Sequence, residues 1–141
     1  MTRRDEHGSA TLETAVLAPA LLAILLMIAV AGRIAIAHQS VDSAAAAGAR
    51  AASISRTKAA ANTEANSVVS TTLANQGITC TELVITTDRT GFDIRVGEEA
   101  TITTTVSCAV SLADLVAIAG VPGSVTLTSS ASSPLDQFRE R

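Results

Sequence analysis

The chain has 141 residues, a formal net charge of −3, two cysteines and two phenylalanines, and it lacks tryptophan and tyrosine. This length allows one modest folded unit together with one membrane segment, and so few aromatic residues exclude a large aromatic core. The acidic balance, with ten scattered basic residues and no aromatic stacking platform, argues against nucleic acid as a partner.

A stretch without any charged residue runs from Thr14 to Gly32, between Glu13 and Arg33. As a helix it would be roughly 28 Å long, close to the thickness of the hydrocarbon layer of a bilayer. The sequence therefore predicts a transmembrane helix over residues 9–37, embedded in the lipid bilayer. A short polar leader, residues 1–8, precedes it.

Three interpretations of this N-terminal region compete. Arg3 and Arg4 followed by an apolar run suit a secretory signal peptide, and cleavage after Ala31 or Ala37 would then release a small secreted binding domain. A generic membrane-anchored structural protein explains the length of the run but gives Glu13 no role. Pilin precursors combine a short polar leader, a glycine before the cleaved bond and a glutamate at the fifth mature position. Cleavage between Gly8 and Ser9 places Glu13 fifth, so the third interpretation uses every feature.

Glu13 is expected to act in assembly. A carboxylate at the edge of the hydrocarbon costs a few kcal/mol, so such a residue usually has a partner and a function. Cleavage after Gly8 would create a partner, because the new α-amine of Ser9 lies four residues earlier on the helix. In a filament, Glu13 could instead neutralise the α-amine of a neighbouring subunit.

Residues 38–76 are rich in alanine and predict a helical extension of the membrane helix. Ile34, Val41, Gly48 and Ser55 recur every seven residues and form a narrow stripe of small side chains with the alanines between them. This stripe suits either close approach by another helix or packing on the chain's own domain. Gly77 is expected to end the helical region in the left-handed conformation.

Residues 78–131 predict a small β-rich domain outside the cytoplasm, followed by a polar tail over 132–141. β-branched and threonine-rich runs alternate there with turn signals. The strands are expected at 79–87, 92–96, 100–110 and 123–131, with a short helix starting near Ser111. Within 100–110, Ile102, Val106, Cys108 and Val110 share one face, which indicates a half-buried antiparallel strand. The expected fold class is α+β, a long N-terminal helix followed by an antiparallel sheet of three or four strands.

The two cysteines, Cys80 and Cys108, both lie in the predicted β-rich domain. An even pair behind an export-type segment favours a disulfide in an oxidising compartment, and the alternative is two buried free thiols. Such a bond would close a loop of 29 residues, worth about 3–4 kcal/mol in the loop-entropy account.

Catalytic and metal-binding patterns are weak. His7 and His38 are too few and too far apart to indicate a metal site. Asp88 and Asp93 flank a turn and are expected to be solvated acids rather than calcium ligands. Ser9 has no neighbouring base that would make it a nucleophile. We therefore expect neither an enzyme nor a cofactor.

The run Gly8-Ser9-Ala10-Thr11-Leu12-Glu13, followed by Pro19 and an apolar stretch that closes on Gly32-Arg33, resembles the TadE/TadF-like family. These are minor pilins, or pseudopilins, of the tight-adherence (Flp pilus) system within the type IV pilin superfamily. The resemblance implies processing by a prepilin peptidase, a single-pass location in the cytoplasmic membrane, association with the pilus at the cell surface, and partnership with other pilin-like subunits and the assembly machinery. The C-terminal domain is then expected outside the cytoplasm.

Overall fold

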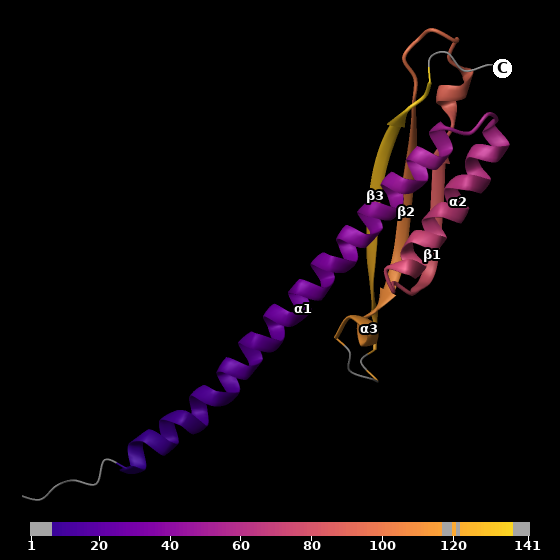
Figure 1. Cartoon of the computed structure of the whole chain (residues 1–141). Helices are drawn as coiled ribbons and strands as arrows, with labels where there is room; N and C mark the ends of the chain where they lie inside the picture. The colour runs from indigo at the N-terminus through magenta and orange to yellow at the C-terminus, as the bar shows by residue number, and fades with distance from the viewer. Residues whose placement is uncertain (1–6, 117–119, 121, 137–141) are drawn as a thin grey trace, which may run out of the picture.

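The computed structural model describes the backbone of residues 7–116, 120 and 122–136, and the side chains of these residues from Thr14 onward. It confirms the expected α+β class, with a long N-terminal helix followed by a three-stranded antiparallel sheet (Figure 1). The elements are α1 (His7–Ser53), α2 (Lys58–Asn75), β1 (Cys80–Asp88), the 3₁₀ turn η1 (Thr90–Asp93), β2 (Thr101–Ser111), α3 (Leu112–Val116) and β3 (Ser124–Pro134).

Helix α1 is continuous over 47 residues, which corresponds to about 70 Å at 1.5 Å per residue. Its N-terminal half extends away from the rest of the molecule, and its C-terminal half lies across the sheet (Figure 1). Alanine, the strongest helix former, dominates this second half. One helix therefore belongs both to the projecting segment and to the folded domain.

The expected helical extension is interrupted after Ser53 and resumes as α2, so the two helices form a hairpin (Figure 1). The hydroxyl of Ser53 donates to the carbonyl of Arg50, and that of Ser55 donates to the carbonyl of Ala51. Such bonds compete with helical ones at the end of α1. Thr57 then caps α2, because its Oγ1 accepts from the Ala60 amide at 3.1 Å.

Gly77 ends α2 as predicted, with a φ of 71°. Its amide donates to the carbonyl of Ala74, and the Ile78 amide donates to the carbonyl of Leu73, both at 3.0 Å. These two bonds form a Schellman motif, and Ile78 packs on the core cluster that contains Leu73. The motif turns the chain directly into β1.

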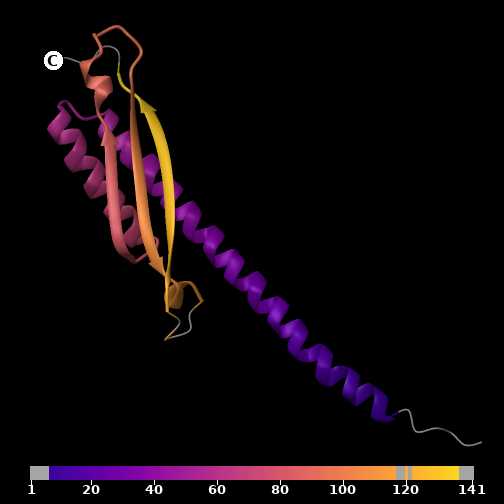
Figure 2. The same ribbon diagram turned by 180° about the vertical axis from the view of Figure 1, so that it is seen from behind.

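The sheet has the order β1-β2-β3, with both neighbouring pairs antiparallel. The α1–α2 hairpin covers one face (Figure 1) and leaves the other face open (Figure 2). On that open face, three hydroxyl pairs connect β2 with β3: Thr103–Ser132 at 2.8 Å, Thr105–Ser130 at 2.8 Å and Ser107–Thr128 at 3.1 Å.

The core lies between this sheet and the helical hairpin. The predicted alternation in β2 is confirmed, because Ile102, Val106, Cys108 and Val110 are all buried. Thr104 is also fully buried on this face, where its hydroxyl lies 3.4 Å from that of Thr87. The helices contribute mainly small side chains to this core. They are Ala37, Val41, Ala44, Ala45, Ala49 and Ala52 from α1, and Ala61, Ala65, Val69 and Leu73 from α2.

The expected short strand at 92–96 does not form, and the chain makes the turn η1 there instead. Gly91 packs so closely on the start of β2 that a Cβ atom would lie 2.4 Å from the Thr101 carbonyl oxygen. Phe92 and Ile94 are half-buried against a second small core cluster. They bury apolar surface without joining the sheet, so the alternating pattern was misleading at this point.

Candidate functional site

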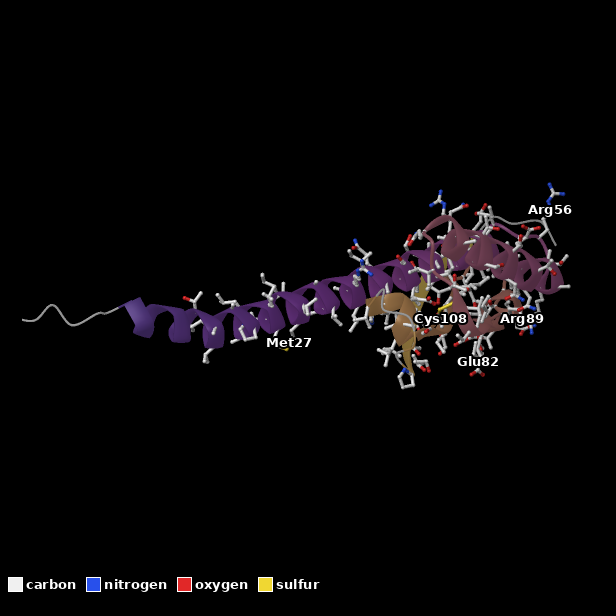
Figure 3. The ribbon with its side chains drawn as sticks, turned by 90° about the horizontal axis from the view of Figure 1, so that it is seen from below. Met27, Arg56, Glu82, Arg89 and Cys108 are labelled. Atoms are coloured by element: carbon white, nitrogen blue, oxygen red, sulfur yellow. A yellow bond between two sulfur atoms is a disulfide. The ribbon has the colours of Figure 1, made fainter. Side chains whose placement is uncertain are left out.

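The projecting half of α1 carries the predicted membrane segment. Val16 is 71% exposed and Met27 is 67% exposed, and Figure 3 shows Met27 on the bare helix far from the domain. Within the described part of the chain, α1 is the one helix long and apolar enough to cross a bilayer. Large apolar side chains held this far from any core require lipid or other helices around them.

The predicted processing and assembly residues all lie at the start of α1. The helix begins at His7, so Gly8, Ser9 and Glu13 fall within its first two turns. The first six residues of the leader lie outside the described residues. Cleavage after Gly8 and the pairing of Glu13 therefore remain predictions.

Arg33, the first charged residue after the apolar segment, marks the junction with the folded domain. Its Nη1 donates to the backbone carbonyl of Leu115 in α3, at 3.4 Å. One turn further along α1, Ala37 is almost fully buried, and Ile34 packs against the same core cluster. The domain therefore begins where the uncharged segment ends, with no flexible linker between them. The sequence did not reveal this contact, because its two partners are 82 positions apart.

The stripe of small residues on α1 packs against α2 and β2 of the same chain. The closest approach is at Gly48, where a Cβ atom would lie 2.6 Å from Cγ2 of Val69 and 3.3 Å from Cγ2 of Thr104. Of the two alternatives left open by the sequence, packing on the chain's own domain is therefore observed. The small side chains allow two helices and a strand to meet at one point.

Cys80 and Cys108 form a disulfide, as predicted, with an S–S distance of 1.97 Å and a Cα–Cα distance of 5.3 Å. The bond joins β1 to β2 beside a shift in strand register between Cys80 and Glu82. Figure 3 shows the bond inside the domain, next to the label of Cys108. The alternative of two free thiols is excluded. The bond fixes the edge strand β1 to the centre of the sheet.

The two turn acids have partners within the chain. Nζ of Lys58, at the start of α2, lies 2.6 Å from Oδ2 of Asp93. Oδ1 of Asp88 accepts from the Thr90 amide at 3.0 Å, and this bond lowers the pKa of the Asp88 carboxyl. Among the described residues, no group of three or more histidine, cysteine, aspartate or glutamate side chains lies close enough together to hold a metal ion. These acids organise the turn η1 between β1 and β2, and Asp93 joins it to the start of α2.

Comparison with known families bears on the same helix. The model of the TadE family, described as TadE-like protein, matches residues 8–50. Over this segment the chain is similar to TadE-like proteins. The match begins at the glycine before the predicted cleavage point and ends on the part of α1 that packs in the domain. The resemblance seen in the sequence is thereby confirmed over this segment. No curated protein and no solved structure matches the chain.

Proposed function

We propose that the chain is a minor pilin-like subunit, or pseudopilin, that acts in assembly of a tight-adherence (Flp-type) pilus. Its role would be structural rather than enzymatic. The observation that carries this proposal is the TadE-like match, because it includes Gly8, Glu13 and the whole uncharged segment. The form of α1 supports it, since one rigid helix presents an apolar half for a membrane or filament and attaches it directly to a folded domain.

We further propose that a prepilin peptidase cleaves the chain after Gly8. The leader, residues 1–8, would be lost, Ser9 would become the N-terminus, and α1 would remain intact. Helix α1 would then cross the cytoplasmic membrane once, with the domain outside the cytoplasm. The disulfide supports this orientation, because such bonds persist in oxidising compartments.

The packing of α1 argues against release of the domain by signal peptidase after Ala37. That cleavage would remove Ala37, which is almost fully buried in the core, together with Ile34 and the contact of Arg33 with Leu115. Cleavage after Ala31 would leave these contacts intact. The mass of the mature protein distinguishes this outcome from cleavage after Gly8.

The assembly role of Glu13 is tested with a Glu13→Ala variant produced in the native host. We expect it to be processed and inserted normally, yet to lose cross-linking to other pilin-like subunits, because the carboxylate that pairs with an α-amine is absent. Glu64→Ala is the matched control, since Glu64 is an exposed acid on α2, away from the membrane segment. Cross-linking that is equal in the Glu13→Ala variant and the wild type would remove the assembly role from Glu13.

A further inference from the structure

Helix α3 lies at the end of the domain nearest the projecting half of α1 (Figure 1). The contact between Arg33 Nη1 and the Leu115 carbonyl oxygen places α3 beside the residue at which the uncharged segment ends. If Thr14–Gly32 fills the hydrocarbon layer, then Arg33 lies among the lipid headgroups. Helix α3, which Arg33 contacts, would then lie at the depth of the headgroups as well.

The domain has little freedom to move away from this level. Helix α1 runs without a break from His7 to Ser53, and its residues from Ile34 onward pack on the sheet and on α2. The start of α3 is attached to the residue before β3, because the amide of Leu112 donates to the carbonyl of Gly123 at 3.0 Å. The end of the domain formed by α3 and the start of β3 is therefore fixed relative to the membrane segment.

Charge is distributed unequally between the two ends of the domain. At the end nearest the membrane segment, α3 and the described residues that follow it before β3 carry one charged residue, Asp114, and Arg33 of α1 lies beside them. At the opposite end, the α1–α2 turn and the connection between β1 and β2 carry many charges of both signs. They are Arg56, Lys58, Arg89, Asp93, Arg95, Glu98 and Glu99. Ionised groups are costly next to the hydrocarbon layer, so a surface that contacts its boundary favours few of them, whereas a solvent-exposed distal end accommodates many.

We infer that the α3 end of the domain lies on the bilayer surface, so that the protein contacts lipid through this surface as well as through α1. The contacting surface contains Asp114, Pro122 and Gly123, which are exposed, and Val116, which is half-buried. Its partner is the zwitterionic headgroup region, which has no net charge, because the sequence from Ala100 to Leu135 contains no lysine or arginine that could form a basic cluster for anionic lipid. The inference rests on the proposed function only in taking α1 as the membrane span.

The absence of tryptophan and tyrosine allows a direct test with one introduced fluorophore. Pro122→Trp and Asp114→Trp each place a reporter on the proposed surface. Ile54→Trp is the distal control, because Ile54 is 78% exposed at the hairpin turn. Met27→Trp is the control within the span. Each full-length variant, with its disulfide intact, is reconstituted in phosphatidylcholine vesicles with and without brominated acyl chains.

We expect Pro122→Trp and Asp114→Trp to emit at shorter wavelength than Ile54→Trp and to lose intensity in brominated vesicles. The loss should be smaller than that of Met27→Trp, because interfacial tryptophan lies at headgroup depth. Emission from both surface reporters that matches Ile54→Trp, with Met27→Trp still quenched, overturns the inference and leaves the span intact. Absence of quenching at Met27→Trp overturns the span and the inference together.

Discussion

Gly48 is the position on α1 at which close packing leaves no room for a side chain. A single added carbon would meet Val69 on α2 and Thr104 on β2 at the same time. Glycine is a poor helix former, by about 1 kcal/mol relative to alanine. Its presence in the middle of α1 is therefore explained by the space that three elements share.

Gly48→Ala is expected to lower the free energy of unfolding by about 1 kcal/mol, because overpacking of about 1–3 kcal/mol exceeds the gain in helix propensity. Urea unfolding in detergent measures this change. In a Val69→Ala background the closest contact is gone, so the same substitution should become neutral or stabilising. The same loss in both backgrounds would contradict this account of Gly48.

The disulfide is expected to stabilise the domain by about 3–4 kcal/mol, because it closes a loop across two strands of a sheet with few large side chains. Replacing both cysteines with alanine should lower the free energy of unfolding by this amount, which is measured as a lower midpoint of urea unfolding. Treatment with reductant should lower the stability of the wild type but leave the double variant unchanged. A wild-type midpoint that is insensitive to reductant would show that the bond contributes no stability.

The lowered pKa of Asp88 predicts a small pH dependence of the stability of the fold. Its pKa is lowered from 3.8 in the folded state by hydrogen bonds from Thr90, so the unfolded chain binds the proton more readily. The contribution of the ionised Asp88 carboxylate to stability is therefore fully present above pH 3.8 and is lost as the pH falls through the folded-state pKa. An Asp88→Ala variant should show a weaker loss of stability between pH 5 and pH 2. Identical acid profiles would exclude this role.

At the level of residues, the sequence identified those with a local signal and missed those with a distant partner. Gly77 follows a helix and precedes a strand, so its left-handed conformation could be predicted from its neighbours. Lys58 and Asp93 pair across 35 positions, and only the fold brings them together. The roles predicted for Gly8 and Glu13 rest on spacing and on the TadE-like match, and they await experiment.

Strand β3 forms one edge of the sheet, and its hydrogen-bond pattern can be assigned from its two ends. The Leu135 amide donates to the Ala100 carbonyl at 2.8 Å, and the Leu112 amide donates to the Gly123 carbonyl. Antiparallel pairs alternate between bonded and non-bonded. Odd-numbered residues of β3 therefore bond to β2, and the amides of even-numbered residues point to the free edge.

This alternation predicts opposite effects of proline at adjacent positions. Thr128→Pro should be tolerated, because the amide of Thr128 makes no bond in the sheet. Ser129→Pro should lose a ladder hydrogen bond, and its free energy of unfolding should be about 1–3 kcal/mol lower than that of Thr128→Pro. Thr128→Ala and Ser129→Ala control for loss of the hydroxyl groups. Thermal unfolding of the four variants measures the difference. Equal losses for the two prolines would contradict the assigned pattern.

Elements with a strong local pattern were predictable, and the turns between them were less so. The alternation in β2 predicted its buried face, and the alanine content of α1 and α2 predicted helix. The hairpin break depends on Thr57 as a cap and on the hydroxyls of Ser53 and Ser55, which are weak signals within an alanine-rich run. The 92–96 segment followed a strand pattern, but Phe92 and Ile94 meet a core formed by residues distant in sequence.

The whole molecule combines two environments on one helix. Its N-terminal half exposes large apolar side chains, while its C-terminal half forms the small-residue core of an α+β domain stabilised by a disulfide. Arg33 separates the two and contacts α3. The central claim is that this helix belongs to a pilin-like precursor and stays in the mature protein after a short leader is removed.

The intact mass of the protein extracted from membranes of its native host tests this claim most directly. The account predicts a mature chain that begins at Ser9, lacks the eight residues of the leader, and keeps the whole of α1 and the disulfide. Cleavage after Ala31 or Ala37, or a chain that retains its leader where a prepilin peptidase is active, would contradict it.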